Sequence, residues 1–140
     1  MDRQLIETAI MSAKENPMRW GIDDCSLWVC DLILEARGRD LAAVFRGKYR
    51  SASGAYRVLK RYAGGGLVEA AIKIAAEHKL RPAKFPWKGI LVGVISDKNG
   101  PALALHYANV WIGRTERGFT TSPSSSGVIA WELPAWRRRH

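Results

Sequence analysis

Apolar residues recur at helical spacing through the first half of the chain. Residues 6–13 carry one every three or four positions, which predicts an amphipathic helix that ends where Asn precedes Pro at 16–17. Residues 25–36 are apolar around nearly the whole circumference of a helix, which predicts a buried central helix. Gly38 is suited to the left-handed conformation that ends such a helix.

Two shorter helices are predicted to follow the central one. The first would run to Tyr62 and be capped by Ser51 or Ser53, whose hydroxyls can accept a hydrogen bond from the first turn. Three glycines at 64–66 then break the chain, and residues 67–80 place apolar side chains on one helical face. The glycines lack the Gly-Lys-Ser/Thr ending of a phosphate-binding loop, so we interpret them as a hinge between helices.

The second part of the chain has the pattern of strands. Residues 89–96 are strand-like, 97–100 is a turn signal, and 102–112 is predicted to form one long second strand. Shorter strands are predicted at 119–122 and 128–133. Helices followed by an antiparallel sheet predict an α+β fold, in which N-terminal helices with a buried central helix pack on a small C-terminal antiparallel β-sheet.

Length and composition fit a single domain over residues 1–140. The 140 residues are 47% hydrophobic and 25% charged, which is ordinary for a globular protein with its own core. No stretch reaches the roughly 20 apolar residues that cross a membrane, and the N-terminus has no secretory signal. We therefore expect synthesis in the cytoplasm and no transmembrane segment.

The net charge of +9 favours anionic partners but does not identify one class of them. Six Lys or Arg residues lie within 46–61, and residues 137–139 are three consecutive arginines. This balance suits nucleic acid, an anionic cell envelope or an acidic protein. Tyrosines among the basic residues are compatible with nucleic-acid contact, but we identify no RNA-binding or zinc-finger signature. We interpret most of these residues as solvated helix faces and do not favour nucleic-acid binding.

Cys25 is the candidate nucleophile. It lies at the start of the predicted central helix, where unpaired backbone N–H groups and the helix dipole favour a thiolate that could attack a carbonyl. An inert buried cysteine is the alternative. Asp23 and Asp24 are predicted to shape the preceding turn and cap the helix. Cys30 is predicted to be a core residue, and without a Cys/His cluster we predict no metal or cofactor.

His106 is the candidate base, because the other two histidines are terminal or late in an amphipathic helix. In a strand over 102–112, His106 shares a face with small alanines. The central helix could pack closely there and bring Cys25 to His106. The alternative is a buried histidine whose ring nitrogens are satisfied locally. Three residues could orient the ring, namely Thr120, Thr121 and Asn109.

Residues 20–26, Trp-Gly-Ile-Asp-Asp-Cys-Ser, resemble the nucleophile segment of the NlpC-type papain-like cell-wall peptidases. The order of helices, cysteine helix and small antiparallel sheet is also similar to theirs. This resemblance implies a papain-like fold and a cysteine peptidase or amidase that acts on peptidoglycan stem peptides. It implies Cys25 as the nucleophile and His106 as the base, with no cofactor.

A second resemblance covers almost the whole chain. It is to small phage and prophage tail-region proteins with a Trp-Gly-x-x-Asp-Cys motif, here at 20–25. They share an Arg-Gly-x-Tyr segment, here at 46–49, and a Gly-Ala-x-Arg helix, here at 54–57, and they end near Ala-Trp-Arg, here at 135–137. This resemblance implies a component of the tail tip or baseplate in the virion tail, with other baseplate proteins as partners.

Two hypotheses from different classes remain open. In the first, the chain is a tail-tip peptidase that opens peptidoglycan for genome entry. In the second, the same fold is a non-catalytic structural adaptor or plug of the baseplate. A basic nucleic-acid-binding accessory protein is a third. Departures from the peptidase pattern favour the structural hypothesis: Met18 replaces a frequent tyrosine, and His106 is one position from the expected spacing to Gly113.

Overall fold

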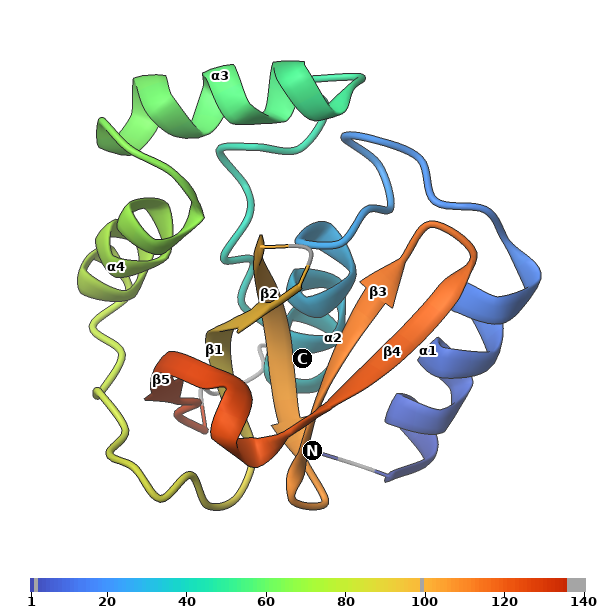
Figure 1. Ribbon diagram of the computed structural model, residues 1–140, viewed down its shortest axis with the longest axis vertical. Coiled ribbons are helices and arrows are strands. Elements are labelled where there is room, and N and C mark those ends of the chain that lie inside the picture. Colours follow the sequence, from blue (N-terminus) through green and yellow to red (C-terminus); the bar gives the residue numbers. More distant parts are fainter. Residues whose placement is uncertain (2, 99, 136–140) are drawn as a thin grey trace.

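The computed structural model describes residues 1, 3–98 and 100–135. Four helices come first (Figure 1), namely α1 (Arg3–Glu15), α2 (Leu27–Arg37), α3 (Ala52–Ala63) and α4 (Leu67–Glu77). Five strands follow, namely β1 (Leu91–Asp97), β2 (Gly100–Tyr107), β3 (Val110–Thr115), β4 (Gly118–Pro123) and β5 (Gly127–Glu132). A 3-10 turn, η1 (Ser124–Ser126), separates the last two. The predicted α+β class is confirmed.

The strands form one antiparallel sheet in the order β4-β3-β2-β1-β5. Because β5 pairs with β1, the chain passes through η1 from one edge of the sheet to the other. α1 packs on β4, and α4 packs on β1 and β2. α3 packs against α4 and lies across the top of the molecule in Figure 1, apart from the sheet.

The central helix α2 is buried, as its apolar circumference predicts. It packs on β2 and β3, and Cys30 lies in the main core together with Leu105 and Ile112 of the sheet. Gly38 ends the helix at a φ of 75° and donates its N–H to the carbonyl of Leu34, as expected of a left-handed cap. The remaining buried residues of this helix are Leu27, Trp28, Val29, Leu32 and Ile33.

The long strand expected over residues 102–112 is two strands. The chain reverses at Ala108 and Asn109, whose φ angles of 51° and 65° are those of a two-residue hairpin turn. Asn adopts this conformation readily, but Ala does not, and no glycine marks the turn. The residues before and after the turn are both apolar and strand-like, so the sequence pattern predicts one continuous strand where the structure has two.

This turn sets which side chains of β2 and β3 share a face of the sheet. His106 lies opposite Leu91 on β1 and Trp111 on β3, so these three side chains share one face of the sheet. α2 packs on the other face, which carries Leu105 and Ile112. The expectation that α2 packs on the His106 face is therefore wrong. The larger aliphatic side chains bury more apolar surface against the helix than the alanines beside His106 could.

Candidate functional site

The carboxylate of Asp24 organises the turn that leads into α2. It accepts hydrogen bonds from the backbone N–H groups of Gly21 at 2.9 Å, Ser26 at 3.1 Å and Leu27 at 3.0 Å. The hydroxyl of Tyr49 donates to it at 2.6 Å. Asp24 is fully buried. The prediction that Asp24 shapes this turn and caps the helix is confirmed.

The Arg-Gly-x-Tyr segment packs against the same turn. The N–H of Gly47 donates to the carbonyl of Gly21 at 3.0 Å. Gly21 has a φ of 80°, and a Cβ at this position would collide with the backbone carbonyl of Tyr49. Only glycine allows this approach. Two motifs that lie far apart in the sequence thus form one structural unit, in which Tyr49 is a central residue that sequence reasoning did not single out.

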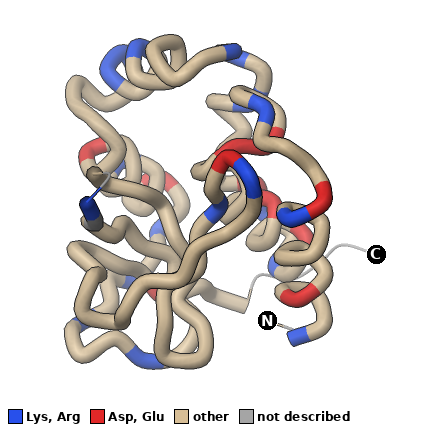
Figure 2. Tube along the Cα trace, turned by 45° about the vertical axis from the view of Figure 1, so that its right-hand side comes forward, with Lys and Arg blue, Asp and Glu red and all other residues tan. Residues whose placement is uncertain are grey.

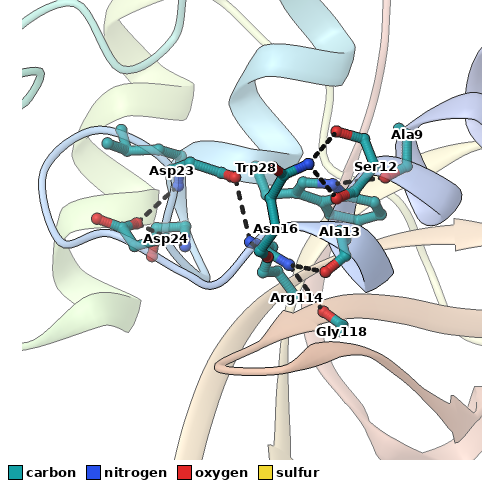
Figure 3. A network of polar contacts seen from close by, with 11 residues as sticks. Ala9, Ser12, Ala13, Asn16, Asp23, Asp24, Trp28, Arg114 and Gly118 are labelled. Atoms are coloured by element: carbon teal, nitrogen blue, oxygen red, sulfur yellow. Dashed lines mark hydrogen bonds and ion pairs between the residues drawn. The ribbon is translucent and has the colours of Figure 1, made fainter.

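Asp23 has a different role, which Figure 3 shows. Its Oδ2 lies 3.2 Å from Nη2 of Arg114, a residue of β3 whose side chain is fully buried. The same guanidinium donates to the carbonyls of Ala13 at 2.7 Å, Asn16 at 2.8 Å and Gly118 at 3.2 Å. One side chain therefore joins the turn before α2, the end of α1 and the β3–β4 hairpin.

Cys25 lies two residues before the first residue of α2 and is half-buried. Burial raises the pKa of its thiol above the usual value, and the charge of Asp24 raises it further, against smaller opposing hydrogen bonds. This direction is opposite to the expectation from the helix N-terminus. The physical reason is that burial and the neighbouring charge of Asp24 outweigh the hydrogen bonds from the Ser26 hydroxyl and from the backbone N–H groups of Cys25 and Ser26, which lower the pKa.

We therefore expect Cys25 to react more slowly with iodoacetamide than N-acetylcysteine does at pH 7.5. The half-maximal rate should lie at a higher pH than that of N-acetylcysteine, because the alkylating reagent reacts with the thiolate. A Cys30→Ala variant leaves Cys25 as the single thiol for the measurement, and the same variant in concentrated urea serves as the unfolded control. A half-maximal rate at lower pH than in urea would contradict this account.

The structure does not bring His106 and Cys25 together. His106 is 1% exposed, and its Nδ1 lies 2.8 Å from the carbonyl oxygen of Gly89 while its Nε2 lies 3.1 Å from the hydroxyl of Ser124. Its ring meets Trp111 edge-on, with centroids 4.8 Å apart. Both ring nitrogens thus have local partners on the face of the sheet opposite α2, as the alternative interpretation of this histidine expected.

Two cavities share Cys25 as a lining residue. An apolar cavity of about 380 Å³ lies among α2, α3 and α4, and a more polar groove of about 580 Å³ lies along β2, β3 and β4. Cys25 and Pro101 line both. The groove lies where the sheet is open, because the residues of β2 that pair with β3 are only 105–107. The start of β2 and the end of β3 therefore diverge, as Figure 1 shows.

The groove beside Cys25 holds no general base among the described residues. Its charged side chains are Lys98 and Arg114, and the first residues of β2 at this point are Gly100 and Pro101. Thr120 lines the groove, whereas Thr121 and Asn109, the other two candidates for orienting an imidazole, are exposed elsewhere. The arrangement can bind a molecule next to a thiol, but it lacks a group that would take the proton of that thiol.

The described part of the chain contains no group of three or more His, Cys, Asp or Glu residues that could hold a metal ion. Within residues 1, 3–98 and 100–135, no helix is long and apolar enough to span a bilayer. The arginines at 137–139 lie outside the described residues.

Fold and site together define an α+β domain whose central helix begins next to a half-buried cysteine, beside a groove whose lining holds no general base among the described residues. The chain belongs to the family described as a domain of unknown function, DUF6950, whose model matches residues 2–133. No curated protein matches the chain, and neither does any solved structure.

Proposed function

We propose that this protein is a non-catalytic structural component of a phage tail tip or baseplate, with a papain-like arrangement of a cysteine helix on an antiparallel sheet. The observation that carries the non-catalytic assignment is the separation of the two candidate catalytic residues. Cys25 lies at the start of α2, whereas His106 faces the opposite side of the sheet and is hydrogen-bonded there. A cysteine nucleophile is activated by an adjacent base or by a lowered pKa, whereas burial raises the pKa of Cys25 and the groove lining holds no base among the described residues.

The motifs shared with tail-region proteins support a structural role, because they hold the fold together. Gly21 and Asp24 of the first motif contact Tyr49 of the second. Gly54 of the third motif is buried, and a Cβ at this position would lie 3.2 Å from the Cβ of Tyr49, so α3 approaches this tyrosine closely. Gly21, Asp24, Tyr49 and Gly54 of these motifs are thus accounted for by packing and hydrogen bonding around Tyr49.

The first test is digestion of purified peptidoglycan, with the wild-type protein and Cys25→Ala compared over the same period. We expect no muropeptide release above the buffer control from either protein, while a peptidase known to cut the same substrate provides the positive control. Release by the wild type that Cys25→Ala abolishes would replace the structural proposal with the peptidase hypothesis.

The second test concerns the tail. Purified tail particles should contain the protein, and Cys25→Ala should be incorporated in the same amount as the wild type, measured by quantitative mass spectrometry. Particles from a strain that lacks the gene are the control for contamination. Tails assembled and infectious without the protein would overturn the assignment to the tail structure.

A further inference from the structure

We propose that the two cavities at Cys25 together bind a small amphiphile with one apolar chain and an anionic head group. The chain would lie in the apolar cavity among α2, α3 and α4, and the head group would lie in the groove along β2, β3 and β4. This assignment concerns a ligand of the isolated domain and does not depend on the role in the tail.

The apolar cavity has the size and lining of a site for a hydrocarbon chain. Its volume is about 380 Å³, whereas an apolar cavity of about 150 Å³ is enough to bind benzene, so by proportion it has room for roughly fifteen carbon atoms. Side chains from three helices, from residues 42–49 and from β2 form the walls, among them Leu27, Phe45, Ala55, Leu59, Ile74 and Leu103.

Polar groups lie at one end of this cavity, which gives a bound chain a direction. Cys25 and Ser26 line the cavity at the start of α2, and Cys25 and Pro101 also line the groove. There the lining changes to the hydroxyl-bearing Thr120 and Ser122 and the ammonium of Lys98. A ligand that fills both spaces therefore needs an apolar part and a polar part, joined next to Cys25.

The charges around the two cavities favour an anionic head. Asp24 is the one acid of either lining among the described residues, and both of its oxygens accept hydrogen bonds. Arg114 is paired with Asp23, and Lys98 is the second cation of the groove lining. Residues 41–68, which form much of the cavity wall, contain six Lys or Arg and no Asp or Glu. Figure 2 shows this basic character along α3 at the top of the molecule.

The test uses dodecanoate below its micelle concentration, titrated into the full-length protein by isothermal titration calorimetry. We expect saturable binding of one dodecanoate per chain, and slower alkylation of Cys25 when dodecanoate is present. Ala55→Trp, which fills the cavity from α3, should weaken binding at least tenfold. Ala63→Trp, on the same helix but outside the lining, is the matched control and should bind as the wild type does.

The head group is tested with dodecyltrimethylammonium and with Lys98→Glu. Dodecanoate should bind at least tenfold more tightly than the cationic detergent, and Lys98→Glu should reduce this preference while Lys84→Glu, at an exposed position outside both linings, should not.

Ala52→Trp at the exposed cavity rim replaces Ala55→Trp if thermal unfolding shows that the latter is misfolded. Non-saturable binding, no effect of the folded cavity variant, or equal affinity for both detergents would overturn the assignment.

Discussion

Replacing Asp24 with alanine is expected to lower the free energy of unfolding by about 3–5 kcal/mol. The carboxylate is fully buried and satisfies three backbone N–H groups and the hydroxyl of Tyr49. Its removal leaves these four donors without an acceptor, two of them in buried and two in partly buried hydrogen bonds, and each such loss is costly. Urea unfolding at pH 7, followed by far-ultraviolet circular dichroism, measures the change.

Two variants separate the Asp24 network from a general effect of losing an acid. Tyr49→Phe removes one of the four hydrogen bonds and should cost about 1–2 kcal/mol, since the other three donors stay paired. Glu7→Ala removes an exposed carboxylate that pairs with Arg3 on the surface of α1, and should change stability by less than about 0.5 kcal/mol. Equal losses for Asp24→Ala and Glu7→Ala would show that the buried network does not hold the turn.

Helices and their ends were readable from the sequence because local chemistry determines them. The circumference of α2 is apolar, and Gly38 and Ser51 are residues suited to the caps they form. Ser51 accepts a hydrogen bond from the N–H of Gly54 at 3.1 Å, as a cap residue should. The position of Asp24 before an apolar run was enough to predict its capping role.

The faces of the sheet could not be read in the same way. Alternation predicts which side chains share a face only while the strand continues, and the reversal at Ala108 and Asn109 changes the assignment for every residue after it. For His106, which comes before the turn, the reason is different: alternation does not tell which of the two faces of the sheet α2 covers. The local environment of His106 was among the alternatives. A hairpin turn without glycine has no strong signal in one sequence.

The site around Cys25 is a product of tertiary structure. Its cavity collects residues from the turn before α2, from residues 42–59, from α4 and from the start of β2. No periodicity relates such distant segments, so the sequence could point to Cys25 but not to its surroundings. The raised pKa of this thiol is one consequence, because burial by these segments and the charge of Asp24 outweigh the hydrogen bonds that the helix start offers to a thiolate.

Arg114→Met is expected to destabilise the protein by about 3–5 kcal/mol, because it breaks a buried ion pair and leaves the remaining partner uncompensated. Methionine keeps much of the aliphatic volume but cannot donate to the carbonyls of Ala13, Asn16 and Gly118. It also removes the guanidinium that faces Asp23. Unfolding in urea at pH 7 gives the loss, and Arg117→Met, at an exposed position of the same hairpin, should stay within about 0.5 kcal/mol of the wild type.

A double-mutant cycle tells whether the ion pair or the carbonyl contacts of Arg114 matter more. If the uncompensated charge of Asp23 causes much of the loss, then adding Asp23→Asn to Arg114→Met should recover roughly 1–2 kcal/mol. If the three carbonyl contacts dominate, the double variant should be no more stable than Arg114→Met alone. An Arg114→Met variant as stable as Arg117→Met would contradict both possibilities, because it would mean that α1, the turn before α2 and the β3–β4 hairpin hold together without this side chain.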